Sequence, residues 1–177
     1  MRTPLVVAVV LALSSSAFGG DPQSSGFGFV CAKANGRLSS EFSDVLAPLM
    51  VQFGGQGVAS WGERAVSVRL SHGGSPELLV PLSCGATGNC VWAVLASSPA
   101  RSLGVVSGSV IQLRREKAGW VVIAAYSGHG LGAGDVTTYE YADRSYRKVE
   151  VGKLTPSAAD TFQSCVDNEK CCPRSAT

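Results

Sequence analysis

With 177 residues, of which 45% are hydrophobic and 16% charged, the chain has the length and apolar content of one folded domain, which argues against general disorder. Its 21 glycines and 7% aromatic residues indicate many tight turns rather than long helices. A formal net charge of +2 gives no sign of a surface for nucleic acid or anionic lipid.

The N-terminal residues have the pattern of a cleaved secretory signal peptide. Arg2 supplies a positive charge, and residues 5–13 are apolar. Small residues follow at the spacing that a signal peptidase reads, either Ser15 and Ala17 or Ala17 and Gly19. The apolar run is shorter than the roughly 20 residues of a membrane span. We therefore predict a signal peptide at 1–19, no membrane anchor after its removal, and a periplasmic or secreted protein. The mature chain would keep 14 Lys and Arg against 13 Asp and Glu, which predicts no nucleic-acid partner.

One amphipathic helix is predicted near the start of the mature chain. Residues 20–36 are rich in Pro, Ser and Gly and are predicted to be a flexible lead-in. Residues 38–53 carry apolar side chains at helical spacing, with Ser39 or Ser40 able to cap the first turn. Pro48 lies inside this segment, where it removes a backbone donor and can kink or end a helix.

From Ala65 onward the pattern is that of strands. Val66, Val68 and Leu70 alternate with polar residues, which is the period of a half-buried strand. Further strands are predicted at 77–82, 90–95, 109–113, 119–126, 136–141 and 146–151. The glycine-rich run at 128–134 is predicted to be a loop between two of them. Strands at this short spacing, joined by glycine turns, indicate an antiparallel sheet or meander.

The domain is predicted to end with a second helix. Thr155 or Ser157 can cap it, and Pro156 lies where a first-turn proline is tolerated. Its buried face would consist of Phe162, Cys165 and Val166.

No long linker divides the chain after the lead-in, so we predict a single β-rich domain at 37–172, followed by a tail at 173–177. The predicted fold class is mainly β (α+β): one antiparallel, disulfide-stapled sheet with an N-terminal and a C-terminal helix.

The six cysteines of an exported chain are predicted to form disulfides: Cys31, Cys84, Cys90, Cys165, Cys171 and Cys172. Six cysteines allow 15 pairings, and spacing alone does not choose among them. Cys84 and Cys90 flank a turn-rich loop that could bring their sulfur atoms together. Cys31 and the three C-terminal cysteines could join the termini. The neighbours Cys171 and Cys172 rarely bond to each other, because such a ring strains the disulfide geometry.

The stretch from Pro81 to Trp92, with its Cys-Gly-x-x-Gly-Asn-Cys loop, resembles the signature of an uncharacterised family of small bacterial exported proteins. The similarity continues through Leu103-Gly104 and Gly119-Trp120, and through the residues between 127 and 141, so that it covers roughly 76 to 148. This resemblance implies a β-rich fold and an exported location, and it implies no activity.

Residues 74–80 are similar to the start of a strand in FG-GAP-type repeats, in which an aspartate-rich loop binds calcium. The corresponding loop here, residues 70–74, contains no aspartate. Calcium requires several oxygen ligands, carboxylates foremost, so the resemblance does not imply a calcium site.

A histidine-based mechanism would have to use His72 or His129, the two histidines of the chain. Ser127, His129 and Asp135 have the residue types of a nucleophile triad. Triad members usually converge from separate elements, and no Gly-x-Ser-x-Gly elbow accompanies these three. We therefore interpret His129 as a residue of a polar hairpin loop that hydrogen-bonds to backbone. A small secreted hydrolase that uses His129 with Ser127 and Asp135 is the alternative.

Two further patterns match cofactor or metal sites only in part. The glycine run at 128–134 leads into a strand, whereas a phosphate-binding loop opens a helix. Cys165, Cys171 and Cys172 with His72 lack the ligand spacing of a structural zinc site. We predict no cofactor and no metal, with a thiol- or metal-handling protein as another alternative.

The remaining candidates are distinguished by little more than residue type. Four acidic residues could serve in hydrolysis: Glu77, Asp135, Glu140 and Asp143. Trp92 and Trp120 lie in apolar runs and are predicted to fill the core, whereas Trp61 is freer to contact a saccharide.

With no convincing catalytic set, the leading hypothesis is an exported non-enzymatic binding or structural module of the bacterial envelope. Its partner would be an envelope component or a protein, and no catalytic residue is assigned.

Overall fold

The computed structural model describes residues 29–30, 38–53, 65–86, 88–130 and 133–155. Its elements follow in the order β1 (Phe29–Val30), η1 (Ser40–Phe42, a single 3-10 turn), α1 (Ser43–Phe53), β2 (Val66–Val68), β3 (Glu77–Cys84), β4 (Cys90–Ser97), β5 (Ala100–Gly108), β6 (Val110–Lys117), β7 (Trp120–Gly130), β8 (Ala133–Ala142) and β9 (Ser145–Lys153).

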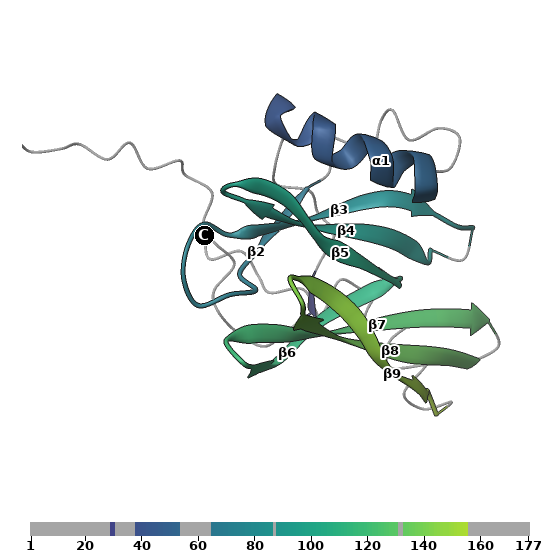
Figure 1. Ribbon diagram of the computed structural model, residues 1–177. Helices are drawn as coiled ribbons and strands as arrows, with labels where there is room; N and C mark the ends of the chain where they lie inside the picture. The colour runs from purple at the N-terminus through teal and green to yellow at the C-terminus, as the bar shows by residue number, and fades with distance from the viewer. Residues whose placement is uncertain (1–28, 31–37, 54–64, 87, 131–132, 156–177) are drawn as a thin grey trace, which may run out of the picture.

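All of these strands belong to one nine-stranded sheet, in the order β1-β6-β7-β8-β9-β5-β4-β3-β2. Neighbouring strands are antiparallel except β5 and β9, which run parallel and meet at one register position, Gly104 opposite Tyr146. The sheet curls at this junction, so that β2–β5 form one layer and β6–β9 a second layer facing it (Figure 1). The mainly β fold agrees with the prediction, and the parallel contact is a feature that a simple meander lacks.

The main core lies between the two layers. Successive side chains of a strand point to opposite faces, so that alternate residues of each layer meet in this space. The buried residues of this core are Val66, Val68, Leu70, Leu79, Trp92, Val94, Leu103, Val106, Ile111, Val121, Ile123, Ala125, Tyr139 and Tyr146. Each fully buried Leu or Ile stabilises the fold by about 1.5–3 kcal/mol, so this cluster dominates stability.

A second core lies between α1 and the outer face of the β3–β5 layer, which the helix covers (Figure 1). Phe42 is buried there against Val80 and Leu95, and Leu46 and Leu49 of the helix pack on the same cluster. The helix lies within the range in which a helix is predicted, and it passes through Pro48. Packing of its apolar side on the sheet outweighs the one hydrogen bond that the proline removes.

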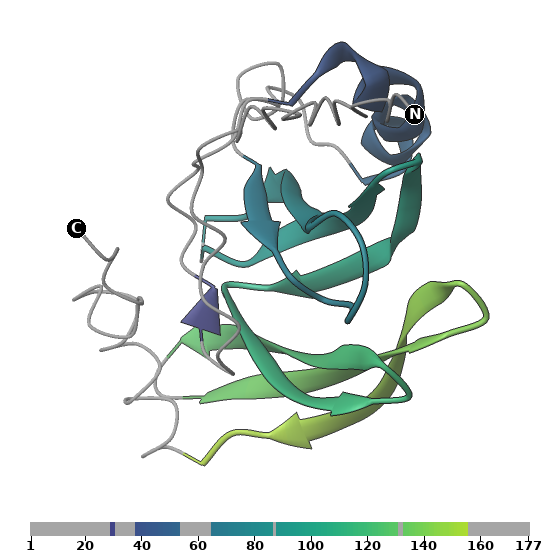
Figure 2. The ribbon, with the colours of Figure 1, turned by 90° about the vertical axis from the view of Figure 1, so that its left-hand side faces the viewer.

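The two layers are joined at both ends of the space between them. At one end, the backbone N–H of Val121 donates to the Leu70 carbonyl at 2.8 Å, and Ser71 pairs with Trp120 in an isolated antiparallel bridge. Within the β6–β9 layer, the Tyr146 hydroxyl donates to the Val121 carbonyl at 2.9 Å. At the other end, the Asn89 side chain reaches from the β3–β4 loop to the backbone of Gly128 in β7. Figure 2 shows the layers from the side, with α1 at the top, the β2–β5 layer beneath it and β9 along the lower boundary.

Four strands differ from the sequence prediction. β5 was not predicted, because Gly104 and Gly108 interrupt its apolar residues. β7 and β8 extend into the predicted glycine loop, where Gly128 pairs with Gly134. β1 lies in the predicted flexible lead-in and pairs with β6. The predicted signal peptide, the C-terminal helix and the cysteines Cys31, Cys165, Cys171 and Cys172 lie outside the described residues.

Candidate functional site at the ends of β7, β8 and β9

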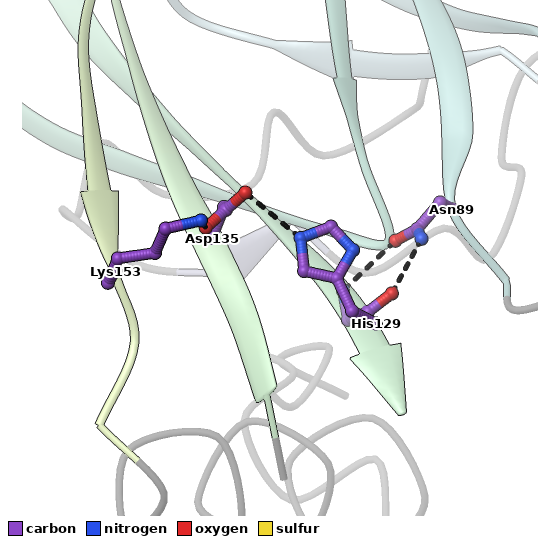
Figure 3. Close-up of polar contacts among 5 residues, drawn as sticks. Asn89, His129, Asp135 and Lys153 are labelled. Carbon is purple, nitrogen blue, oxygen red and sulfur yellow. Dashed lines mark hydrogen bonds and ion pairs between the residues drawn. The ribbon is translucent and has the colours of Figure 1, made fainter. Parts of the chain in front are cut away.

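The register of three neighbouring strands brings a cluster of ionisable side chains together. Ser127 of β7 lies opposite Asp135 of β8, and Asp135 lies opposite Lys153 of β9. His129 is the extra residue of a bulge between Gly128 and Gly130 near the end of β7, and its side chain points toward that of Asp135 (Figure 3).

Asp135 is the centre of this cluster. One of its carboxylate oxygens lies 2.9 Å from His129 Nε2, and the other accepts a hydrogen bond from Lys153 Nζ at 2.7 Å. These contacts, with Lys153 the larger influence, hold the pKa of the Asp135 carboxyl below its usual value of 3.8. The cluster therefore keeps Asp135 ionised, and His129 contacts a carboxylate rather than the backbone groups that the sequence interpretation assigned to it.

Asn89 fixes the strand that carries His129. Its Nδ2 group donates to the Gly128 carbonyl at 2.9 Å, and its Oδ1 atom accepts from the Gly128 N–H at 3.2 Å (Figure 3). Asn89 itself is held by a tight loop, in which the Gly85 N–H donates to the Asn89 carbonyl at 2.8 Å. The predicted disulfide between Cys84 and Cys90 is present and closes this loop.

The face that bears the cluster is open to solvent. Tyr139 of β8 points toward the other layer, and its hydroxyl accepts a hydrogen bond from the Ser107 N–H of β5 at 3.1 Å. After Ser107, β5 ends over β7, where Gly108 packs against Ala125 and Tyr126. β5 therefore does not cover the part of β8 that precedes Tyr139. The same face of β7–β9 then continues as a surface that we call the open inner face, which consists of Ser127, Asp135, Thr137, Val151 and Lys153.

An exposed valine accompanies the charged groups on this face. Val151 lies opposite Thr137 and is 46% exposed. An apolar side chain beside hydroxyl and charged groups gives this face a mixed, solvent-accessible composition rather than that of a core.

The predicted triad residues are only partly brought together. His129 and Asp135 are in hydrogen-bond contact, and Ser127 lies opposite Asp135 in the ladder. Within the described part of the chain, no hydrogen bond joins the Ser127 hydroxyl to His129, which is the contact that would activate a serine nucleophile.

The other predicted acidic candidates lie apart from this cluster. Glu77 is 4% exposed, and its carboxylate accepts hydrogen bonds from the Leu70 N–H at 2.7 Å and the Ser71 hydroxyl at 2.6 Å. Glu140 pairs with Lys117, and Asp143 lies in an exposed turn. Glu77 thus supports the fold and the other two lie at the surface.

Histidine, tryptophan and metal-site candidates are also placed by the fold. His72 is exposed and pairs with Glu116. Trp92 is buried, as predicted, and Trp120 is partly buried and stacks on Tyr141 with ring centroids 3.7 Å apart. Trp61 lies outside the described residues.

Among the described residues, no three His, Cys, Asp or Glu side chains gather as metal ligands. No helix in this part of the chain is long and apolar enough to span a membrane.

Lys153, Asn89 and Val151 were not found by sequence reasoning. Asn89 stands in the Cys-Gly-x-x-Gly-Asn-Cys loop but was given no role there, and nothing in the local sequence marks Lys153 or Val151. Each of the three joins the site through contacts between distant elements. No protein-family model, curated protein or solved structure matches the chain. The function therefore has to be inferred from the site itself.

Proposed function

We propose that the protein is an exported, non-enzymatic binding module of the bacterial envelope whose ligand contacts the open inner face. The observation that carries this proposal is the exposure of Val151 beside the ion pair of Asp135 and Lys153. These side chains lie on the same face of the sheet as the main core, at a place that β5 does not cover.

Several features suit this face to binding. It offers the hydroxyls of Ser127 and Thr137, the ionised groups around Asp135, and an apolar contact at Val151. These side chains project from paired strands rather than from loops, and Asn89 ties the end of β7 to the other layer. A preformed surface loses little conformational entropy when a ligand binds.

The hydrolase alternative has less support. A serine nucleophile needs a base within about 2.6–3.2 Å of its hydroxyl. His129 Nε2 is instead turned to Asp135, whose second oxygen is held by Lys153. In the described part of the chain, this arrangement has the form of a surface ion cluster.

Two features support the exported part of the proposal. The disulfide between Cys84 and Cys90 fits a compartment that is not reducing. Residues 1–19 have the pattern of a signal peptide. The ligand would then be an envelope component or a protein that meets the chain after export.

Site-specific photo-crosslinking of the exported full chain in bacterial cells tests the binding proposal. A photoreactive residue placed at Val151 is expected to give discrete crosslinked species that weaken in the Lys153→Ala background. Val51, which is 89% exposed on α1, is the matched control position and is expected to give none of them. Identical patterns from positions 151 and 51 would overturn the proposal. A species with the mass of two copies is assigned to self-association and not to a ligand.

A serine-reactive fluorophosphonate probe tests the alternative. We expect no labelling of Ser127. Labelling of Ser127 that disappears in the His129→Ala variant would instead support the hydrolase and overturn the proposal of a non-enzymatic binding module.

A further inference from the structure

The disulfide between Cys84 and Cys90 lies next to the loop that reaches the candidate site. The two cysteines are directly opposite each other, at the last position of β3 and the first position of β4. Both are only partly buried, and Gly85 and Ala86 beside them are exposed. Exposed disulfides exchange with thiols more readily than buried ones, because a thiolate can reach a sulfur atom from solvent. This bond is therefore placed where it can open and close in the folded protein.

Asn89 connects this bond with the candidate site. It immediately precedes Cys90, and its side chain makes two hydrogen bonds to the backbone of Gly128, 39 residues along the chain. The next residue of β7 is His129, whose ring contacts the Asp135 carboxylate (Figure 3). The position of Asn89 thus helps to fix the end of β7 that carries His129 against the other layer.

Opening of the disulfide should loosen the loop without unfolding the layers. β3 and β4 remain paired over the rest of their length, and the main core lies away from the bond. The bond joins cysteines with a sequence separation of 6, and such a short loop constrains the unfolded chain least. The loop itself keeps a backbone hydrogen bond from Gly85 to Asn89, in a segment that is mostly exposed. Exposed segments of this kind open at a lower free energy than core strands.

We propose that the Cys84–Cys90 disulfide is a redox-sensitive latch on the candidate site. When the two thiols are oxidised, an S–S bond forms between them. Their two electrons and two protons pass to the disulfide of an oxidant, which becomes a dithiol. The closed loop then holds Asn89 on Gly128, and the end of β7 is fixed. A dithiol reverses the exchange and releases this end, while the two-layer fold persists.

The latch goes beyond the proposed function, because it concerns the order of the end of β7 and not the ligand. It makes the candidate site depend on the compartment: the end of β7 is loose where thiols stay reduced and fixed where disulfides form. The test uses the purified chain without ligand, so that the latch and the binding proposal can fail independently.

The test compares the purified, disulfide-bonded full chain with its Cys84→Ser/Cys90→Ser variant, which leaves the other cysteines unchanged. Hydrogen exchange of the Gly128 amide measures the latch, because this N–H donates to Asn89 Oδ1. We expect exchange at Gly128 to be about tenfold faster in the variant. Equal exchange at Gly128 in the two proteins would overturn the inference.

Two controls separate the latch from general loosening. The Val121 amide donates to the Leu70 carbonyl at the other end of the layers, and its exchange should stay the same in the variant. In an Asn89→Ala background, removal of the disulfide should no longer accelerate exchange at Gly128, because the acceptor is already absent. Acceleration of equal size in that background would mean that Asn89 does not transmit the effect, and would overturn the latch.

A second measurement follows the natural chain in buffers of reduced and oxidised dithiothreitol, with alkylation and peptide mapping. We expect Cys84 and Cys90 to take up label while the fluorescence of the buried Trp92 keeps its folded value. Labelling that begins only after this fluorescence has changed would overturn the inference. So would a Cys84→Ser/Cys90→Ser variant that does not fold, because a latch requires a folded open state.

Discussion

Gly104 of β5 lies directly against the backbone of Tyr146 in β9, at the one register position that pairs these two strands. A Cβ atom at position 104 would come within 2.8 Å of the Ser145 hydroxyl oxygen and 2.9 Å of the Tyr146 carbonyl oxygen. The φ angle of Gly104 is +119°, which residues with a side chain rarely adopt. The close approach of β5 to β9 therefore depends on glycine at position 104. After this contact the two strands separate.

Replacement of Gly104 by alanine should lower the free energy of unfolding by about 2–5 kcal/mol, because it adds backbone strain and a clash with β9 backbone. Gly119→Ala is the matched control: its φ is +79°, and nothing lies within 4 Å of the added Cβ. The control should cost only about 1 kcal/mol. Urea denaturation of both variants measures the difference, and equal losses would show that strain alone, without the contact, accounts for the effect.

The same junction explains why β5 was missed from the sequence. Strands such as β2 and the first half of β7 are rich in β-branched residues and were predicted from local pattern alone. Gly104 serves a contact with a strand that lies far along the chain, so its local effect is only to interrupt the apolar pattern. Gly134 behaves similarly, because an added Cβ there would meet Ser127 and Leu154, and the run was predicted to be a loop.

Glu77 is a buried carboxylate with a structural role, and its removal should be costly. Glu77→Ala would leave the Leu70 N–H without its acceptor in the interior, and the expected loss is about 2–4 kcal/mol in unfolding free energy. Ser71→Ala removes one partner while the carboxylate keeps the other, and should cost about 1 kcal/mol. Denaturant titrations compare the two variants. A Glu77→Ala protein no less stable than Ser71→Ala would contradict this role.

Asn89 should control local opening of the strand that carries His129. Asn89→Ala removes both side-chain hydrogen bonds to Gly128, with an expected loss of about 1–2 kcal/mol. Hydrogen exchange of the Gly128 amide should accelerate in this variant, because that N–H loses its acceptor. Asn89→Asp keeps an acceptor and should protect the amide better than alanine does. Identical exchange rates in both variants would mean that Asn89 does not hold β7.

The site was only partly predictable, for a related reason. His129 and Asp135 were singled out because the chain has two histidines and these two residues are close in sequence. Lys153 and Asn89 reach the same cluster from β9 and from the β3–β4 loop, and only the strand register reveals that they meet. The local pattern identified a possible triad, whereas the fold assembled an ion cluster.

Lys153 should determine how Asp135 titrates. Its hydrogen bond is the largest cause of the lowered pKa of Asp135, and the bond to His129 is the next. A carboxyl group whose pKa is lower in the folded than in the unfolded state stabilises the fold above the unfolded value of about 3.9. That contribution is lost as the pH falls through the folded value.

Lys153→Ala should therefore raise the pKa of Asp135 toward its usual value, and His129→Ala should raise it less. Carboxyl-carbon NMR titration measures the pKa of Asp135 directly in each variant. Lys148→Ala is the control, because Lys148 is exposed on the same strand and makes no contact with Asp135. If the pKa of Asp135 moves as much in Lys148→Ala as in Lys153→Ala, the lowering reflects the general charge of β9 and not the hydrogen bond at the open inner face.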